Sequence, residues 1–566
     1  MVSAPRARVL RWQRAVALVL ALAALSAVAA EVPARAAIAT AHPLATEAGY
    51  GILQQGGNAF DAAVTVAAVL AVVEPYSAGL GGGGFWLLHR AVDRKQIMID
   101  ARETAPAAIA LSLYIDPDGV PVPGATLRGG KAAGIPGVPA GMVHLASRYG
   151  KLRLRQLLAP AIALARDGFN IDSRFARIAK VREPLLRDGV NTARVFLRDG
   201  EAPPQGYLLR QPELAATLER MAEHGRDGFY RGAVAQSLVD GVNAAGGVWQ
   251  AADLANYRIV ERAPVRFSYR GATIVSAALP SSGGVTLAQT LNILESYKVG
   301  DARDPASAHL VIEALRRGFQ DRLRDLGDSD VVKVPVARLV DKTYAHSRAA
   351  SINPNLATPL DALTITPLAA VTESYNTTHY SVIDAEGNRV GATLSINSWF
   401  GAGVVAGDTG VLLNNEIDDF SLGAGLSNLY HLLGGKANAI APHKRPLSSM
   451  SPTFVEDRKG VMVIGAPGGS RIISMVLFGI IDYLNQERVD LLGIVTAPRY
   501  HHQCWPDQVE IEPDSFSDAW RASLEAKGHQ LKLTNRKWGN MQAVFKAVDG
   551  AAQAASDPRG FDMGGY

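Results

Sequence analysis

Cysteine is almost absent from this chain of 566 residues, in which Cys504 is the single example. No intramolecular disulfide can form, so stability must come from a hydrophobic core, for which the 48% of apolar residues is ample. Trp505 beside Cys504 favours a buried, inert thiol over a nucleophile. The pair His501-His502 lies nearby, but HExxH and CxxC spacings are missing, and we therefore expect no metal site.

Long apolar runs and an excess of one charge are missing as well. No run of 18 or more apolar residues follows residue 40, which argues against a stable membrane span. Residues 1–30 contain four of the 57 basic residues and none of the 53 acidic ones, so the rest of the chain carries 53 of each sign. Because no basic stripe with interleaved aromatic residues occurs, we expect no nucleic-acid partner.

The first thirty residues have a composition of their own. Four arginines precede Ala15–Ala30, a run of 16 residues without charge, and small residues follow it. A basic start, a short apolar core and a small-residue exit are typical of a secretory signal. We expect residues 1–30 to be a signal peptide, cleaved near residues 29–36, and the protein to be periplasmic or secreted. An uncleaved anchor is the alternative, because the run is only a little shorter than the ~20 residues of a spanning helix.

Several segments further along have a recognisable pattern. Residues 45–73 are rich in Ala and Val and predict helices packed in a core. The glycines of 79–88 match GxGxxG, but Phe85–Leu88 resembles a strand where a nucleotide loop would open a helix, so we expect a tight turn. Apolar residues four apart in 307–326 predict an amphipathic helix with a charged outer side. Three prolines in 353–371 indicate an exposed linker.

Two alternating stretches, 377–382 and 390–397, flank a turn rich in Asp, Glu, Gly and Asn, which predicts a β-hairpin. The pattern leaves open whether its polar face is exposed to solvent or gathers functional groups. A slip of one residue would put polar side chains on the apolar face, so only registers with an even sum of residue numbers fit. The two registers that suit the turn differ in the partner of Thr377, which is Asn397 or Ser395.

Six spaced motifs in this sequence together resemble γ-glutamyltranspeptidases, members of the N-terminal-nucleophile hydrolase superfamily. The match runs from about residue 38 to residues 555–559. The motifs are Arg102–Pro106, Pro280–Gly284, Thr377–Ser381, Leu413–Ser421, Lys444–Pro452 and Gly465–Arg471.

The resemblance implies an α+β fold, a four-layer αββα sandwich in which two subunits from one precursor share one core. Such precursors cut themselves before a threonine. Here the bond would be Asn376–Thr377, giving a large subunit of residues 31–376 and a small subunit of residues 377–566, which form a heterodimer.

Self-cleavage explains why a threonine stands at the head of this strand. A threonine hydroxyl needs a nearby base to become a nucleophile, and cleavage gives Thr377 its own base in the form of a free α-amine. An α-amine has a pKa of about 7.7–8.0, close to working pH. Before cleavage the same nitrogen is an amide, so activity should require maturation. Thr378 cannot substitute, because its nitrogen stays acylated and its side chain points to the other face.

A γ-glutamyl group presents an α-carboxylate, an α-ammonium group and a scissile amide. A carboxylate calls for a guanidinium and hydroxyl donors, an ammonium for acceptors, and a tetrahedral oxyanion for backbone N–H groups. From the residues alone, Arg102 could equally form a surface ion pair with Glu103, and Asp418-Asp419 a turn or helix cap. The resemblance implies Arg102, Ser448 and Ser449 for the carboxylate, Asn397, Glu416 and Asp419 for the ammonium, and Gly468 and Gly469 for the oxyanion.

Two details refine this reading. Residues 421–441 resemble the lid loop of many bacterial members, and Tyr430 matches the aromatic residue of that lid. Related cephalosporin-acylase-like members often lack such a lid. Ser395 stands where bacterial members typically carry threonine, so the hydroxyl is kept and a methyl group is lost.

The sequence thus predicts an exported γ-glutamyltranspeptidase or glutathione hydrolase with ping-pong kinetics and no cofactor. Thr377 would attack the γ-amide of glutathione or of another γ-glutamyl compound. Water, or an amino acid or dipeptide acceptor, would then take the glutamyl group, and the sequence does not decide between hydrolysis and transfer. The alternatives are a glutaryl-cephalosporin acylase of the same fold and an exported binding protein that never matures.

Overall fold

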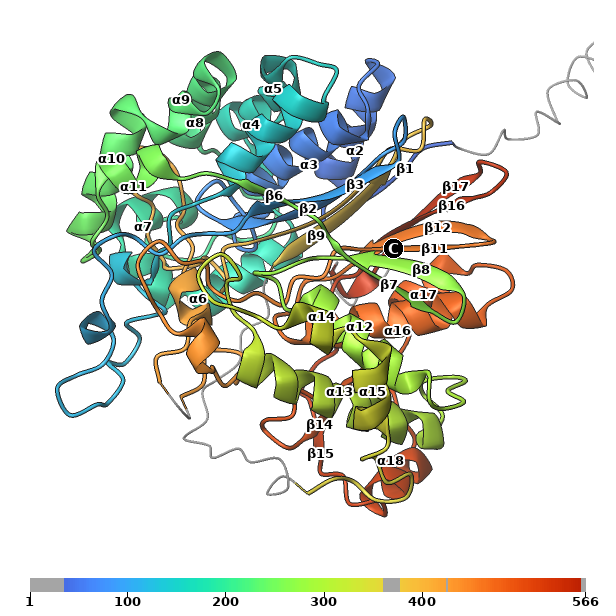
Figure 1. Ribbon diagram of the computed structural model, residues 1–566. Helices are drawn as coiled ribbons and strands as arrows, with labels where there is room; N and C mark the ends of the chain where they lie inside the picture. Colours follow the sequence, from blue (N-terminus) through green and yellow to red (C-terminus); the bar gives the residue numbers. More distant parts are fainter. Residues whose placement is uncertain (1–34, 360–376, 424–425, 561–566) are drawn as a thin grey trace, which may run out of the picture.

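Two six-stranded antiparallel sheets lie face to face at the centre of the computed structural model (Figure 1). The structure describes residues 35–359, 377–423 and 426–560. The strand order of the first sheet is β1 (Ala37–Ala39), β9 (Thr378–Ile383), β10 (Arg389–Ser395), β2 (Gly83–Arg90), β3 (Lys95–Ala101) and β6 (Val260–Arg262). The order of the second is β17 (Ala552–Ser556), β16 (Gln542–Ala547), β12 (Gly460–Gly465), β11 (Thr453–Asp457), β8 (Ala272–Ser276) and β7 (Val265–Tyr269).

Helices from the first half of the chain cover the outer face of the first sheet (Figure 1). The central one, α3 (Ala59–Val73), is buried along its whole length, as its Ala- and Val-rich sequence predicts, and Asn58 and Asp61 form a capping box at its start. This layer consists of α2 (Pro43–Gln54), α3, α4 (Val138–Tyr149), α5 (Leu154–Asp167), α6 (Ser173–Asp188), α7 (Val190–Phe196), α8 (Pro212–His224), α9 (Asp227–Tyr230), α10 (Gly232–Ala244) and α11 (Ala251–Asn256).

A second group of helices packs on the outer face of the other sheet and completes the four-layer αββα sandwich that the resemblance implied (Figure 1). The core between helices and sheet is continuous with the apolar side chains of β8, β11, β12 and β16. The helices are α12 (Gly283–Leu294), α13 (Pro305–Asp325), α14 (Val336–Leu339), α15 (Lys342–Ala349), α16 (Arg471–Asn485), α17 (Leu491–Thr496) and α18 (Asp518–Glu525).

The helix predicted at 307–326 is α13, but the charged outer side expected for it is wrong. Glu313 is fully buried and pairs with Arg316 at 3.1 Å and with Arg317 at 2.7 Å, and both guanidinium groups are buried too. Because α12 and α18 pack against α13, its charged residues face protein and must compensate one another there.

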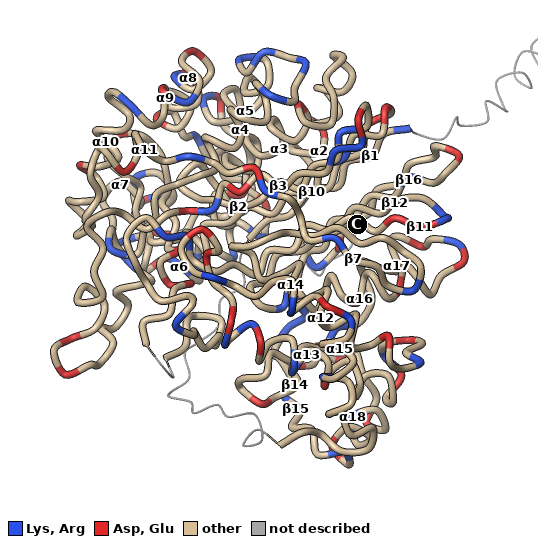
Figure 2. Tube along the Cα trace, in the orientation of Figure 1, with Lys and Arg blue, Asp and Glu red and all other residues tan. Residues whose placement is uncertain are grey.

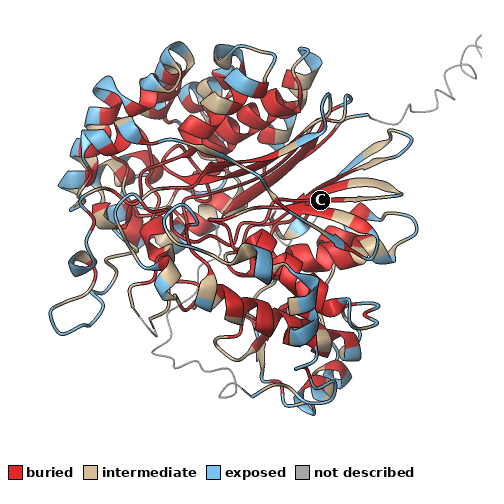
Figure 3. Cartoon of the chain, in the orientation of Figure 1, coloured by how far each residue is buried: buried red, intermediate tan, exposed pale blue. Residues whose placement is uncertain are grey.

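The predicted hairpin is formed by β9 and β10, and its polar face is buried between the two sheets, not exposed to solvent (Figure 3). His379 on β9 binds Thr393 Oγ1 through Nδ1 at 2.8 Å and Ser381 Oγ through Nε2 at 3.1 Å. Ser381 in turn donates to the backbone oxygen of Gln542 on β16 at 3.1 Å. The polar side chains therefore bond to one another and to the opposite sheet, which makes their burial tolerable.

The glycine-rich turn before β2 and the burial of Cys504 both agree with the predictions from the sequence. The glycines of residues 79–82 form a turn that leads into β2, as expected for a strand and not for a nucleotide loop. Burial raises the pKa of the Cys504 thiol to about 12, which fits an inert thiol. Two minor sheets contain β4 (Phe169–Asn170) with β5 (Leu208–Leu209), and β13 (Tyr500–His501), β14 (Val509–Ile511) and β15 (Leu531–Leu533).

Charges of both signs are interspersed over the molecule (Figure 2). Across the described part of the chain, no helix combines the length and the apolarity that a membrane crossing requires. The expected signal peptide of residues 1–30 lies outside the described residues, as does the linker from residue 360 onward. Of its earlier part, residues 353–356 are exposed as predicted.

Candidate active site

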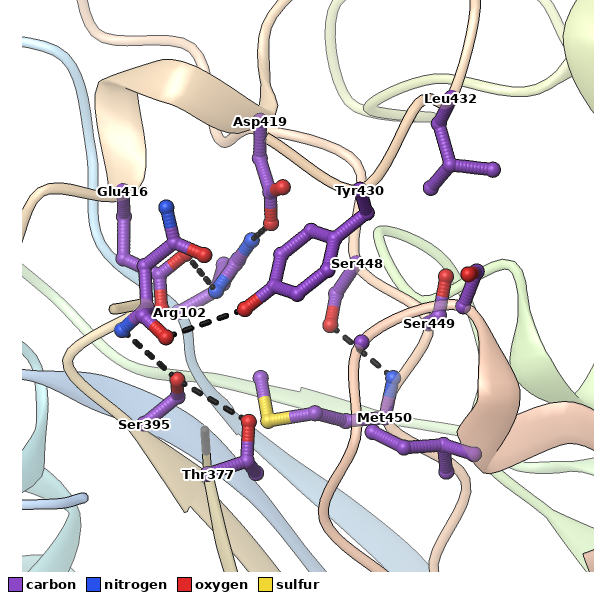
Figure 4. A pocket seen from close by; sticks show the side chains of 14 residues that line it. Arg102, Thr377, Ser395, Glu416, Asp419, Tyr430, Leu432, Ser448, Ser449 and Met450 are labelled. Carbon is purple, nitrogen blue, oxygen red and sulfur yellow. Dashed lines mark hydrogen bonds and ion pairs between the residues drawn. The ribbon is translucent and has the colours of Figure 1, made fainter. Parts of the chain in front are cut away.

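Thr377 stands immediately before β9, with only 4% of its surface exposed, and its hydroxyl donates to Ser395 Oγ across 3.3 Å (Figure 4). The same Ser395 oxygen accepts the backbone N–H of Asn397 at 2.8 Å. The pairing of Thr378 with Leu394 continues to Thr377 and Ser395, so of the two predicted registers the one with Ser395 is correct and the one with Asn397 is wrong. Asn376, on the other side of the expected cleavage point, lies outside the described residues.

The backbone of Thr377 has φ 120°, in a region that β-branched residues rarely adopt. Asn397, at the turn after β10, also has a positive φ of 68°. Its side chain donates to the backbone oxygen of Asn415 at 2.9 Å, which ties the end of β10 to the segment that carries the acidic residues. Non-glycine residues in such conformations cluster at functional sites.

Arg102 follows β3 and is 1% exposed, so the surface ion pair with Glu103 considered from the sequence is wrong. Its guanidinium lies 2.5 Å from Asp419 and 2.9 Å from Glu416, both in the short 3₁₀ turn Glu416–Asp419, and 3.4 Å from Glu103 (Figure 4). Its Nε donates to the backbone oxygen of Pro446 at 3.2 Å. The fork is thus fixed in one orientation by groups from three separate segments.

The carboxylates around this guanidinium outnumber it. Burial lowers the pKa of Arg102, but the charges of Glu416, Glu103 and Asp419 more than reverse this effect and raise it. Burial raises the pKa of Glu416 well above its usual range, although Arg102 opposes that shift. The site therefore favours a ligand that brings one positive and one negative group.

Ser448 and Ser449 reach the site because their segment is held against the start of α12. The backbone N–H of Ser448 donates to the oxygen of Pro280 at 2.8 Å, and the N–H of Ser282 donates to the oxygen of Ser448 at 2.8 Å. Ser448 Oγ accepts the backbone N–H of Met450 at 3.1 Å. The motifs 280–284 and 444–452, far apart in the sequence, are thus one structural unit.

Arg322 on α13 was missed by the sequence analysis. It is 5% exposed, and its guanidinium donates to Ser449 Oγ at 3.3 Å and to Ser282 Oγ at 2.9 Å. Burial lowers its pKa to about 10, and Asp419 opposes this shift. The sequence gave no sign of this role. Arg322 lies in the charged stretch of 307–326, where the pattern does not distinguish a buried arginine from an exposed one.

Gly468 and Gly469 link β12 to α16 with φ angles of 135° and 57°. A side chain at Gly469 would collide with the ring of Tyr430, whose Cδ1 lies 2.3 Å from the position of a Cβ. Both the positive φ and the close ring therefore require glycine at that position. Gly469 lines the same pocket as Thr377.

Tyr430 closes this pocket from the segment 421–441. It is 6% exposed, and its hydroxyl donates to the backbone oxygen of Asn397 at 3.0 Å (Figure 4). Two acidic residues fasten the same segment. Asp419 accepts the amide of Asn428 at 3.0 Å, and Asp418 accepts the backbone N–H of Leu429 at 2.8 Å. Asp419 thus joins this segment directly to Arg102.

The structure brings nearly all of the predicted site residues into one pocket of about 290 Å³, called here the Arg102 pocket (Figure 4). Ten of them line it: Arg102, Thr377, Ser395, Asn397, Glu416, Asp419, Tyr430, Ser448, Ser449 and Gly469. Gly468 lines a neighbouring pocket that also reaches Thr377. Leu432, Met450, Ser470 and Ile472 complete the wall and were not predicted.

Comparison with known proteins agrees with this geometry. The family model described as γ-glutamyltranspeptidase matches residues 45–564. The glutathione hydrolase proenzyme of Escherichia coli (strain K12) is 41% identical over 530 residues, which cover 93% of this chain and 90% of the relative.

Two solved structures represent both branches of the superfamily that the sequence analysis considered. A cephalosporin acylase from Bacillus halodurans aligns with a TM-score of 0.80 at 26% identity, over 93% of this chain and 97% of that one. A Helicobacter pylori γ-glutamyltranspeptidase aligns with a TM-score of 0.55 at 38% identity, over 56% of this chain and 92% of that one. With a family model that spans nearly the whole chain and a relative 41% identical along almost its full length, this protein belongs to the γ-glutamyltranspeptidase family.

Proposed function

We propose that this protein is a self-processing γ-glutamyltranspeptidase and glutathione hydrolase, with Thr377 as its nucleophile. The observation that carries the proposal is the position of Thr377. Its hydroxyl is bonded to Ser395 at the floor of a pocket whose wall holds the buried Arg102 paired with the half-buried Asp419. A nucleophile beside a guanidinium and a cluster of carboxylates suits an amide substrate that carries an amino-acid zwitterion.

Maturation would cut the bond Asn376–Thr377 and yield subunits 31–376 and 377–566. The φ of 120° at Thr377 supports this choice, because cleavage removes the constraint on that angle together with its strain. The freed α-amine would sit next to its own hydroxyl and act as the general base. Both halves contribute strands to the first sheet, with β2 and β10 paired, so the two subunits would remain one heterodimer.

The glutamyl group would bind by exchanging partners with the existing ion pairs. Its α-carboxylate would take the guanidinium of Arg102, with the hydroxyls of Ser448 and Ser449 completing the contact. Its α-ammonium would face Asp419, Glu416 and the side chain of Asn397. A zwitterion satisfies both halves of this cluster at once, whereas the singly charged glutaryl group of a cephalosporin would leave the carboxylates without a cation. This difference favours the glutamyl over the acylase reading.

Chemistry would follow from this placement. Thr377 Oγ attacks the γ-carbonyl carbon while its proton passes to the α-amine, and Ser395 orients the attacking oxygen. Backbone N–H groups at Gly468 and Gly469 would stabilise the oxyanion. Loss of the amine, cysteinylglycine in the case of glutathione, leaves a glutamyl ester. Water or an amino acid or dipeptide acceptor resolves this ester, and segment 421–441 would act as the lid over the glutamyl pocket.

The experiment that tests the proposal is a denaturing gel of purified protein, with N-terminal sequencing of the smaller band and an assay of release from γ-glutamyl-p-nitroanilide. We expect two chains, the smaller beginning at Thr377, and release of the anilide. Thr377→Ala should leave one chain without activity. Thr378→Ala is the matched control, which should still cleave because that side chain lies on the opposite face of β9. A Thr377→Ala chain that splits at the same bond would contradict the mechanism, and a single uncut wild-type chain would favour the binding-protein alternative.

We further propose that the protein is exported to the periplasm or secreted, on the strength of its N-terminal sequence.

A further inference from the structure

Gln503 connects two walls of the Arg102 pocket to each other. It follows β13 by two residues, and none of the six sequence motifs includes it. Its Oε1 accepts the hydroxyl of Ser470, and its Nε2 donates to the backbone oxygen of Tyr430 at 2.8 Å. Ser470 and Tyr430 both line the pocket, whereas Gln503 does not belong to the lining. One side chain outside the pocket thus joins two separate segments that meet there.

All four hydrogen-bonding positions of the Gln503 amide are used. Its Nε2 donates a second bond to the backbone oxygen of Trp505 at 3.0 Å, and its Oε1 lies 3.0 Å from Nε2 of the buried His501. An amide oxygen can only accept, so His501 contributes the proton to that contact. Turning the amide over would set Oε1 against two backbone oxygens. The amide is therefore fixed with its oxygen toward Ser470 and its nitrogen toward Tyr430.

Ser470 ends the turn that contains the consecutive glycines. It stands immediately before α16, where serine commonly caps a helix, yet its hydroxyl makes no capping bond to the described residues of α16. The hydroxyl is directed to Gln503 instead, although Ser470 is only 1% exposed. Both glycines have a positive φ, and glycine leaves a backbone the most freedom. A bond to Ser470 from outside the turn therefore restricts where the N–H groups of Gly468 and Gly469 point.

Tyr430 is held at two points. Its hydroxyl donates to the backbone oxygen of Asn397 at 3.0 Å (Figure 4), and its own backbone oxygen accepts from Gln503. The ring between these two points is so close to Gly469 that a Cβ there would lie 2.3 Å from Cδ1 of the ring. A shift of the Tyr430 backbone would therefore be transmitted to the glycine turn, and Gln503 fixes the separation of the two segments.

We propose that Gln503 is a positioning residue with two separable roles, one at each end of its amide. Through Ser470 it aligns the turn Gly468–Ser470 with the oxyanion, and through the backbone of Tyr430 it keeps segment 421–441 over the bound glutamyl group. The inference rests on the proposed function and adds to it a residue that acts from outside the pocket lining.

The two roles affect different steps. The oxyanion develops only as Thr377 attacks, so a misaligned turn slows acylation without weakening the binding of the donor. The glutamyl group is held from the first encounter onward, so a loosened Tyr430 weakens the binding of the donor. A residue that merely supports the fold would not separate these two constants.

Two variants each remove one end of the connection. Gln503→Glu keeps an oxygen toward Ser470 but replaces the donor by a second oxygen, which the backbone oxygen of Tyr430 repels. Ser470→Ala removes the hydroxyl and leaves the bond between Gln503 and Tyr430 in place.

The measurement is pre-steady-state acylation of self-cleaved protein by γ-glutamyl-p-nitroanilide, which separates the dissociation constant of the donor from the rate constant of acylation. The burst amplitude counts active sites, so incomplete maturation is not mistaken for slow chemistry. We expect Gln503→Glu to raise the dissociation constant several-fold with little change in the rate constant. Ser470→Ala should lower the rate constant on the order of tenfold and leave binding nearly unchanged.

Gln503→Met removes both ends at a similar side-chain length and should show both effects; if it fails to mature, the two single-end variants still decide. Gln508→Glu is the matched control, because it makes the same change on the same segment at a side chain outside the pocket lining, and it should keep both wild-type constants.

Three outcomes would overturn the inference while the wild type releases anilide normally. They are wild-type constants in both single-end variants, the same pattern of losses in both, and a loss in Gln508→Glu as large as in Gln503→Glu. A wild type that releases no anilide would overturn the proposed function itself, and the inference with it.

Discussion

The hydroxyls of Thr377 and Ser395 lie 3.3 Å apart across the β9–β10 hairpin, and the backbone N–H of Asn397 holds the serine oxygen at 2.8 Å. Since that oxygen accepts from both neighbours, Ser395 can fix the direction of the Thr377 hydroxyl. We expect Ser395→Ala to slow acylation by roughly tenfold or more, equivalent to ~1.4 kcal/mol, with a smaller effect on substrate affinity. The measurement is pre-steady-state acylation of fully matured protein.

Ser395→Thr is the conservative counterpart. It keeps the oxygen, so acylation should stay within a few-fold of the wild type. The added methyl group enters a position that is 3% exposed, which sets the limit on tolerance. If matured Ser395→Ala protein is acylated at the wild-type rate, Ser395 is only a strand residue.

Arg102→Lys tests the carboxylate contact. Lysine keeps the charge but loses the fork that spans Glu416 and Asp419. We expect kcat/KM for glutathione to fall, with a loss of transition-state stabilisation on the order of 1–3 kcal/mol. The control is a substrate whose α-carboxylate is amidated, because its loss should be much smaller. If wild type and variant distinguish the two substrates equally well, Arg102 does not bind that carboxylate.

Arg322 is expected to act through Ser449, which its guanidinium contacts at 3.3 Å. Arg322→Gln keeps a donor but removes the charge, and we expect KM for glutathione to rise several-fold with a smaller change in kcat, because only carboxylate binding depends on Ser449. Ser449→Ala provides the comparison. The double variant should be little worse than Ser449→Ala alone if the two residues act as one unit. Fully additive losses would refute the coupling.

Tyr430→Phe tests how the segment 421–441 is fastened. The substitution keeps the ring against Gly469 and removes the hydroxyl that bonds to Asn397 at 3.0 Å. Losing one such bond costs about 1 kcal/mol, so the segment should detach from the pocket roughly fivefold more often. Limited proteolysis within this segment should accelerate by a similar factor. Unchanged proteolysis would mean that the hydroxyl does not secure the segment.

His379 should make stability depend on pH. Burial lowers its pKa in the folded protein from 6.5 to about 3. The unfolded chain therefore takes up a proton there first, and the free energy of unfolding falls as the pH drops below about 6.5. This one group accounts for about 2 kcal/mol between pH 7 and pH 5. Urea unfolding at both pH values should show a smaller difference for His379→Asn than for the wild type, and an equal difference would contradict the assignment.

The alternation of 377–382 and 390–397 was enough to predict the hairpin and to limit its register, because a side chain in a strand can face only two ways. Turn geometry left two registers, and the tertiary structure selected the one that joins Thr377 to Ser395. The motifs, the hairpin and the lid-like segment together indicated ten residues of the Arg102 pocket. Local pattern and family motifs therefore carried most of the site.

What the sequence determined by itself was the alternation that places Thr377 at the head of a strand and the polar or apolar character of each face. Only the tertiary structure decided what each polar face meets. The charged stretch of α13 became an interior network, and Arg322 came to support Ser449. The physical reason is that periodicity records polarity along one element, whereas burial depends on which other elements pack against it, as α12 and α18 do against α13.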